Sequence, residues 1–467
     1  MKLIRIINLI IIISFFAFPS RAQAPYEKLT YNYPYKDGIP FSRYKDRRQK
    51  IVEFMSPKSF AIVLSPDYYT QIKEFYRQNI FNSNLFYFTG LPEQEAVLLL
   101  IPGNYKYNGI KCNDMIFLED QSKKDIIWNG LKVNLYEAEG MYGISKALYL
   151  SRLDEIIDEL MLLRDTLFLA DFPLTQTEGV LPSENPDIKL EIINKLKAKY
   201  PRLIVKLGIP GLKSMREVKD EDEIKLIKRA VEISVSGFRE AMKAAKPGIK
   251  EYELKAIAEY SFNRLGAECP GYPSVVNGGK NAVFIHGAYS RDLIPDGSLV
   301  IMDCGARFNG YTADITRTFP INGEFSKEQK KIYNIVLEAQ DSAFSACTKE
   351  NSFMTPHVKA LSVIQRGLLE LGIISNANDA RDYFTHATSH YLGIDVHDPG
   401  TFGNLKPGNV ITVEPGIYIP EGSPCDSKWW NICIRIEDDV LITQGEPVIL
   451  TKDLPRKPGD IEDLIGK

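Results

Sequence analysis

The chain has 467 residues, 44% of them hydrophobic and 25% charged, with a formal net charge of −3. This composition is typical of a soluble globular protein and leaves room for two or three domains. No basic stripe runs along the sequence, which argues against a nucleic-acid partner.

The N-terminus has the features of a secretory signal. Lys2 and Arg5 precede the apolar run IINLIIIISFFAF, and Ala22-Gln23-Ala24 offers a small-residue cleavage site. We expect residues 1–24 to be a signal peptide and the mature protein to be secreted or periplasmic, with no stable membrane partner. If the signal stays uncleaved, it would tether the protein to a membrane instead.

Residues of about 42–200 are predicted to form a separate α/β domain. Strands are expected for SFAIVLS from residue 59, NLFYFTG from 84, EAVLLLIPG from 95 and DTLFLADF from 165. The segment 144–163 has helical periodicity. A linker near 200–218 then leads to a helix over 221–245, which ends at Lys246-Pro247-Gly248.

Two aspartates lie on a predicted hairpin. The strand-like runs SLVIMDCGARF (298–308) and YTADITRTF (311–319) flank Asn309-Gly310, the strongest short signal for a type I′ turn. With a two-residue turn, Asp303 lies opposite Thr316, and Asp314 points to the same face one diagonal step away. The alternative is a solvated hairpin face, which the surrounding apolar residues argue against.

Two glutamates lie on further predicted strands. NVITVEPG (409–416) reads as a strand ending at Glu414, and NICIRIEDDVLI (431–442) as one strand on which Cys433, Arg435 and Glu437 share a face. Between these regions, 326–347 and 357–372 are predicted helices, the first starting with Ser326 and Gln329 in capping-box spacing.

Four carboxylates and one imidazole therefore lie beside apolar runs. Burying them is costly unless cations neutralise them, which predicts two divalent metal ions. An oxygen-dominated set with one nitrogen favours Mn²⁺, with Co²⁺, Fe²⁺ or Zn²⁺ as alternatives. The five candidate ligands are Asp303, Asp314, His390, Glu414 and Glu437.

Several motifs in the same order resemble one family. GYTADITRTFPINGEF, SHYLGIDVHD, VITVEPGIYI and IRIEDDVLIT are similar to the dinuclear "pita-bread" metallopeptidases, closest to the aminopeptidase P and prolidase branch. The resemblance covers residues of about 220–455. It implies an α/β (α+β) protein: a catalytic domain over 215–455, with a curved antiparallel sheet and backing helices, preceded by a smaller creatinase-type domain that roofs the site.

The resemblance also implies roles for individual residues. Asp303 would bind one metal and His390 the other, Asp314 and Glu437 would bridge them, and Glu414 would bind the second metal and handle protons. Two further histidines, His286 and His397, match catalytic positions. The substrate-binding positions are matched by His386, Tyr418 and Arg435. His357 is expected to be a helix-surface residue without a chemical role.

The implied activity is release of the N-terminal residue before a proline, by attack of a hydroxide that bridges the two metals. The segment from Asp398 to Glu414 contains no arginine, whereas dipeptide-specific prolidases carry one in a longer insertion there. The alternatives are an Xaa-Pro dipeptidase and a non-catalytic peptide-binding protein. The family implies a homo-oligomer, a dimer or tetramer. Tyr272, Trp429 and Trp430 are candidates for apolar walls around the proline ring, and equally for ordinary core packing.

The six cysteines do not form a disulfide scaffold or a zinc-type cluster in a chain of this length. Cys425 and Cys433 are the closest pair in sequence. An oxidising compartment would permit bridges between them or others. All six are Cys112, Cys269, Cys304, Cys347, Cys425 and Cys433.

Overall fold

The computed structural model describes residues 38–65, 81–91, 95–170, 186–285 and 291–466. The predicted signal peptide and His286 lie outside these ranges. Within them, no helix combines the length and the apolar character needed to span a bilayer. The described chain is a mixed α/β protein, which confirms the predicted fold class.

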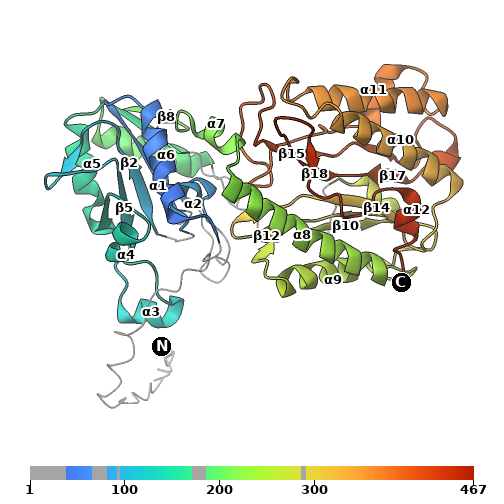
Figure 1. Cartoon of the computed structure of the whole chain (residues 1–467), viewed down its shortest axis with the longest axis horizontal. Helices are drawn as coiled ribbons and strands as arrows, with labels where there is room; N and C mark the ends of the chain where they lie inside the picture. The colour runs from blue at the N-terminus through green and yellow to red at the C-terminus, as the bar shows by residue number, and fades with distance from the viewer. Residues whose placement is uncertain (1–37, 66–80, 92–94, 171–185, 286–290, 467) are drawn as a thin grey trace, which may run out of the picture. The chain divides into compact units, whose positions relative to one another are not determined.

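The N-terminal part is built on one six-stranded mixed sheet (Figure 1). Its strands pack apolar side chains on both faces, so β1 and β2 are buried along their whole length. The sheet order is β6 (Lys146–Tyr149), β5 (Asp114–Leu118), β2 (Val97–Leu100), β1 (Ser59–Leu64), β7 (Thr166–Leu169) and β8 (Ile204–Leu207). The accompanying helices are α1 (Phe41–Ile51), α2 (Ser83–Thr89), α4 (Leu135–Gly140), α5 (Leu153–Met161) and α6 (Pro186–Lys199), and β3 (Lys106–Tyr107) pairs with β4 (Ile110–Lys111).

Three predictions for this part were wrong. The apolar run 84–90 is the buried helix α2, because the Asn82 side chain accepts hydrogen bonds from the first N–H groups and Gly90, with φ 71°, ends the helix. The segment 144–163 is strand β6 followed by the shorter helix α5. The expected linker near 200–218 instead supplies the edge strand β8 and the helix α7 (Leu212–Glu217).

Residues 121–133 do not belong to the compact unit that contains the rest of the described residues. Their helix α3 (Lys123–Asn129) begins with a capping box, in which Ser122 accepts from the Asp125 N–H and the Asp125 carboxylate accepts from the Ser122 N–H.

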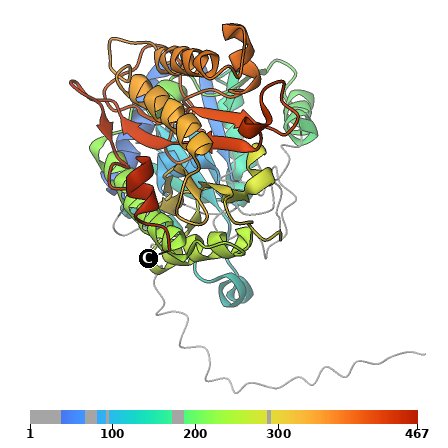
Figure 2. The same ribbon diagram turned by 90° about the vertical axis from the view of Figure 1, so that its right-hand side faces the viewer.

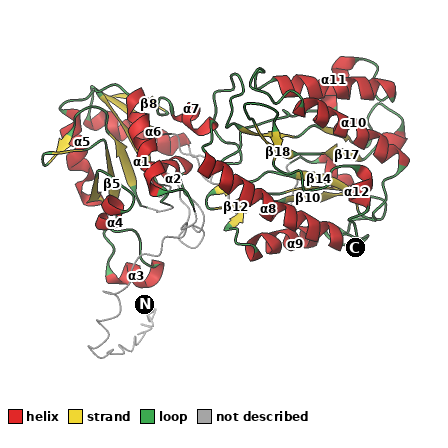
Figure 3. Ribbon diagram, in the orientation of Figure 1, coloured by secondary structure: helices red, strands yellow, loops and turns green. Residues whose placement is uncertain are grey.

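The C-terminal part contains short antiparallel strands covered by helices (Figures 2 and 3). The helices α8 (Glu221–Ala244) and α9 (Glu251–Arg264) pack on the first group of strands, while α10 (Lys327–Phe344) packs on the second group and pairs with α11 (Thr355–Glu370). The predicted capping box of Ser326 and Gln329 is confirmed at the start of α10. The chain ends with α12 (Pro458–Glu462).

The first group of strands carries the predicted hairpin. Asp303 pairs with Thr316, as the turn predicts, and both Asn309 (φ 48°) and Gly310 (φ 82°) have positive φ. Each arm is interrupted, however, at residues 304–305 and 313–315. A Cβ on Gly305 would lie 1.9 Å from the Ala313 carbonyl oxygen, so the arms approach too closely here for a side chain. This group comprises β9 (Cys269–Pro270), β10 (Val275–Gly278), β11 (Leu299–Asp303), β12 (Ala306–Phe308), β13 (Tyr311–Thr312) and β14 (Thr316–Pro320).

The second group corrects another prediction. The run 431–442 is not one strand, because Ile436 and Glu437 separate β17 from β18, and these two strands pair with different partners. Glu437 itself forms an isolated bridge with Thr316 of the first group. The carboxylates of Asp303, Asp314, Glu414 and Glu437 therefore lie at strand ends or breaks. The strands of this group are β15 (Val410–Val413), β16 (Gly416–Ile419), β17 (Ile432–Arg435), β18 (Asp438–Leu441) and β19 (Val448–Ile449).

Candidate active site

Four of the five candidate ligands come into direct proximity. Potential ligand atoms of Asp314, His390 and Glu437 all lie within 4.8 Å of one another. The Nε2 atom of His390 is 3.3 Å from Oδ2 of Asp314 and 3.5 Å from Oε1 of Glu414. Segments that are far apart in the sequence thus bring three carboxylates and one imidazole close together.

The fifth candidate, Asp303, is held beside this group by two neighbours. The Tyr272 hydroxyl donates to Oδ1 at 2.7 Å, and the Arg435 guanidinium donates to Oδ2. Burial raises the pKa of Asp303, the Arg435 charge opposes that rise, and the nearby Asp314 charge adds to it. The sequence suggested Tyr272 as an apolar wall or as a core-packing residue, but the structure makes it a hydrogen-bond donor to a candidate ligand.

Glu437 is fixed by the strand opposite to it. Its Oε2 accepts a 2.6 Å hydrogen bond from the Thr316 hydroxyl, and its backbone N–H donates to the Thr316 carbonyl at 3.0 Å. Burial, followed by the charges of Asp314, Glu414 and Asp303, raises the pKa of Glu437 well above its ordinary range.

The orientation of His390 follows from its other ring nitrogen. Nδ1 lies 3.1 Å from the Tyr391 carbonyl oxygen, which only accepts, so Nδ1 carries a proton and Nε2 faces the carboxylates. Burial lowers the pKa of His390, but the hydrogen bond and charge of Asp314 and the charge of Glu414 outweigh burial and raise it to about 9. Burial raises the pKa of Glu414 to about 7.

These properties fit a site for divalent cations. Carboxylates collected away from water hold their protons tightly, because the charged forms repel each other and lack solvation. A cation replaces those protons and neutralises the cluster. Oxygen ligands with one nitrogen suit a hard or borderline divalent ion.

The candidate substrate residues lie around the same group. The His397 ring packs edge-on against the His390 ring, with centroids 4.4 Å apart, and its side chain is exposed. His386 lies with Nδ1 3.6 Å from Oε2 of Glu414. The described structure thus places both histidines beside candidate metal ligands.

Tyr418 connects His386 to Arg435. The Arg435 guanidinium donates to the Tyr418 hydroxyl at 2.9 Å, and that hydroxyl lies 2.9 Å from Nε2 of His386. Because Nδ1 of His386 lies 2.8 Å from the Ala387 carbonyl, Nδ1 carries the proton in the neutral ring, and Nε2 accepts from Tyr418. Three predicted substrate residues therefore form one hydrogen-bonded series.

Two residues in or beside the site were not identified from the sequence. The buried Asp439 accepts a 3.1 Å hydrogen bond from the Asp314 N–H, and its Oδ1 has no hydrogen-bond partner among the described residues. Thr316 binds both Glu437 and Arg435 through one hydroxyl. Asp439 could have been identified from the sequence, because it lies two residues after Glu437 in the same motif. No feature of the local sequence distinguishes Thr316.

His357 differs from its prediction as a surface residue. It is half-buried on α11, and its Nδ1 is 2.9 Å from the Thr388 hydroxyl. The carbonyl of Thr388 accepts the Glu414 N–H at 2.9 Å. His357 therefore supports the segment that carries His386 and His390.

None of the six cysteines, all of which lie in described segments, is in a disulfide. Cys425 and Cys433, the closest pair in sequence, are both free.

Comparisons with known proteins agree with this geometry. Residues 225–444 match the model of Metallopeptidase family M24, and residues 44–168 match that of the Aminopeptidase P, N-terminal domain. The chain is 33% identical to the Xaa-Pro aminopeptidase of Escherichia coli K12 over 442 residues, which cover 91% of this chain and 98% of that protein. The Haemophilus influenzae Xaa-Pro aminopeptidase is 32% identical, with 92% and 99% covered.

Solved structures show the same similarity. The aminopeptidase PepP of Pseudomonas aeruginosa superposes with a TM-score of 0.78 at 33% identity, covering 91% of this chain and 98% of that one. A variant of Escherichia coli aminopeptidase P, solved in complex with substrate, gives a TM-score of 0.78 at 31% identity, with the same coverage.

Proposed function

Because this chain belongs to metallopeptidase family M24, in its Xaa-Pro aminopeptidase group, we propose that it releases the N-terminal residue from peptides with proline in second position. The observation that carries this proposal is the meeting of Asp314, His390 and Glu437, joined by Glu414, in a chain similar to those enzymes over nearly its whole length.

The residues proposed to hold a pair of divalent metal ions are Asp303, Asp314, His390, Glu414 and Glu437. When bound, such ions polarise the scissile carbonyl and lower the pKa of a water molecule that serves as the nucleophile. We propose Mn²⁺ as the native metal, on the basis of the oxygen-rich ligand set.

The protein groups around the metals orient the peptide and move protons. Glu414 lies between His390 and His386, where its Oε2 is placed to take up a proton and pass it to the departing proline nitrogen. We assign His397 to the substrate carbonyl and His386, with Tyr418 and Arg435 behind it, to the residue after the cleaved bond. We assign His286, which matches a catalytic position of the family, to stabilising the tetrahedral intermediate.

Proline explains the need for a dedicated enzyme. The Xaa-Pro bond has no N–H, and the ring fixes φ, so a peptidase that grips the scissile amide through its N–H cannot hold it. The proposed site would hold the peptide through side chains and metal ions, and it would not need that hydrogen.

Longer peptides are favoured over dipeptides. A dipeptidase must grip the carboxylate of the product proline, yet the only basic side chain between Asp398 and Glu414 is Lys406, which contacts the Glu217 carboxylate. That ammonium is therefore committed within the fold. We also propose that the enzyme is exported, on the strength of residues 1–24, and that it assembles as a homo-oligomer, as the family resemblance implies.

The first test is hydrolysis by the Mn²⁺-loaded mature protein. Xaa-Pro-Yaa tripeptides and matched Xaa-Pro dipeptides are incubated with it, next to a chelated control, and the products are identified by mass spectrometry. Metal-dependent release of Xaa from the tripeptide, with little action on the dipeptide, is expected. Preferential cleavage of the dipeptide would instead identify a dipeptidase, and metal binding without turnover would identify a peptide-binding protein.

A further inference from the structure

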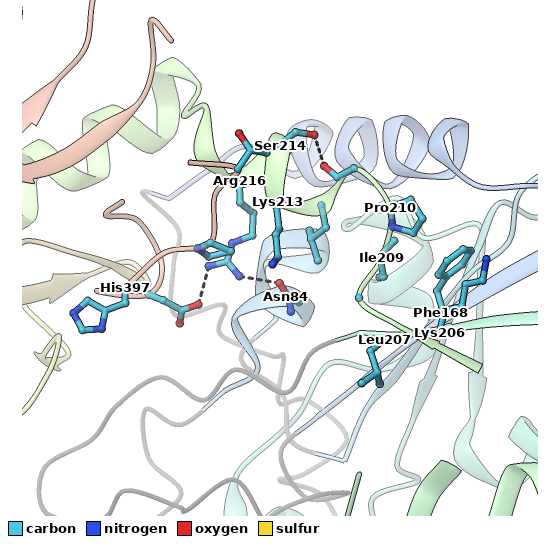
Figure 4. A pocket seen from close by; sticks show the side chains of 16 residues that line it. Asn84, Phe168, Lys206, Leu207, Ile209, Pro210, Lys213, Ser214, Arg216 and His397 are labelled. Atoms are coloured by element: carbon cyan, nitrogen blue, oxygen red, sulfur yellow. Dashed lines mark hydrogen bonds and ion pairs between the residues drawn. The ribbon is translucent and has the colours of Figure 1, made fainter. Parts of the chain in front are cut away.

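A cavity of about 520 Å³ lies along the segment 206–214, and His397 of the candidate active site is one of its lining residues. His397 lies at one end and Phe168, Lys206 and Leu207 at the other, with Lys213 between them (Figure 4). Its volume is within the ordinary range of ligand sites, ~300–1,000 Å³. Because His397 lines the cavity and also packs against the His390 ring, the cavity borders the candidate metal ligands at this residue.

The wall next to His397 contains buried charges that pair with one another. Arg216 is fully buried and donates to Asp395 at 2.9 Å, to Asn84 at 2.8 Å and to Asp398. Asp398 also accepts a 3.0 Å hydrogen bond from the Lys219 ammonium. Each buried charge therefore has an oppositely charged partner, and because Asp398 follows His397 directly, this network holds the backbone next to His397.

The end of the cavity far from His397 is lined by apolar side chains and by two lysines. Phe168, Ile209 and Pro210 line it, and the Lys206 ammonium lies 5.9 Å from the Phe168 ring centroid. Lys206 and Lys213 are exposed, and in the described segments neither has a carboxylate within ion-pair distance. Since Arg216 balances the lining residue Asp395, these two ammonium groups determine the sign of the cavity's charge.

The direction of the peptide follows from the reaction. An aminopeptidase accommodates a single residue on the amino side of the bond it cleaves, so a neighbouring cavity that receives part of the peptide receives residues on the carboxyl side. A peptide that extends past His397 would lead its downstream residues along the segment 206–214.

We propose that this cavity binds the residues that follow proline, and that it selects peptides with an apolar residue and a carboxylate in that part. The apolar side chain packs on Phe168, Ile209 and Pro210, and the carboxylate interacts with Lys206 and Lys213. The carboxylate is the free C-terminus or a glutamate or aspartate side chain. This inference rests on the proposed function, because it extends the same site.

The test compares kcat/KM for matched pentapeptides Xaa-Pro-Phe-Ala-Zaa. Zaa is Glu or Gln, and each peptide carries a free or an amidated C-terminus, so the two sources of carboxylate are separated. The measured quantity is the kcat/KM of a peptide that carries a carboxylate, divided by the kcat/KM of the amidated Gln peptide. The variant Lys206→Glu/Lys213→Glu is expected to lower this ratio by roughly tenfold, mainly through a higher KM for the carboxylate peptides. The charge-neutral Lys206→Gln/Lys213→Gln variant should lower it by a smaller factor.

The matched control is Lys359→Glu/Lys452→Glu, an equal double charge reversal at exposed lysines outside the cavity, which should leave the ratio at the wild-type value. A wild-type ratio near one, or an equal ratio in the cavity variants and the control, overturns this inference while Xaa-Pro cleavage persists. Failure of the wild-type enzyme to cleave any of the peptides overturns the proposed function itself. Thermal unfolding of each variant verifies that it is folded.

Discussion

Replacing Thr316 by valine removes one hydroxyl from the centre of the site while nearly preserving side-chain shape. That hydroxyl donates to Glu437 at 2.6 Å and accepts from Nε of Arg435 at 3.1 Å, and the residue is fully buried. Hydrogen bonds to charged groups contribute about 1.5–3 kcal/mol each, and the unpaired guanidinium nitrogen costs more. We expect the metal-free protein to lose about 2–4 kcal/mol of stability.

The same change should weaken metal binding. Side chains that orient a ligand typically contribute 10–100-fold to metal affinity, so Thr316→Val is expected to raise the Mn²⁺ dissociation constant by about that factor. Calorimetric titration of the chelator-treated protein measures the affinity, and denaturant unfolding measures the stability. Thr316→Ser, which keeps the hydroxyl, should recover most of both.

Thr318→Val is the matched control. The Thr318 hydroxyl lies on the same strand, donates to the Arg435 carbonyl at 2.9 Å and accepts from the Arg435 N–H at 3.0 Å, but contacts no candidate ligand. Its loss should reduce stability with little effect on metal affinity. If both valine variants bind Mn²⁺ equally well, the assignment of Thr316 as the group that orients Glu437 is refuted.

Three further predictions follow from the site. Asp314→Asn or Glu437→Gln should abolish peptide hydrolysis with the fold largely intact and some loss of stability, as circular dichroism would verify; full activity in either variant would contradict the metal assignment. The metal-free protein should lose stability as pH rises from about 5 to about 9, because the pKa of Glu414 is raised to about 7 and that of His390 to about 9, so both groups bind protons more tightly when folded. Without metal, the melting temperature should fall as pH rises across this range, and with Mn²⁺ it should fall less. The same decrease with and without Mn²⁺ would contradict the assignment of these residues as metal ligands. His357→Ala should lower the stability by about 1 kcal/mol and lower kcat, because it removes the hydrogen bond to Thr388. His357→Asn should have a smaller effect on both. Wild-type kinetics for His357→Ala would show that this hydrogen bond does not position the catalytic segment.

Local features of the sequence determined much of the catalytic region. The Asn309-Gly310 turn fixed the register that sets Asp303 opposite Thr316, because both turn residues must have positive φ. The capping box at Ser326 predicted the start of α10 for a similar reason, since both partners lie within one helical turn. The order of the motifs also predicted the five candidate metal ligands.

Short apolar runs were ambiguous without the fold. NLFYFTG is buried on every side, and a fully buried run carries no polar alternation to separate helix from strand. The interruption of the run 431–442 at Glu437 was equally hidden, because β17 and β18 pair with strands that lie elsewhere in the sequence.

The sequence alone thus specified the ligand types, the turns and the caps, because these depend on neighbouring residues and on residue chemistry. Only the tertiary structure showed that Tyr272 and Arg435 hold Asp303, that Thr316 holds Glu437, and that His397 opens onto a lysine-lined cavity. Each of these contacts joins segments far apart in the chain, and such contacts are decided by how the elements pack against each other rather than by any local pattern.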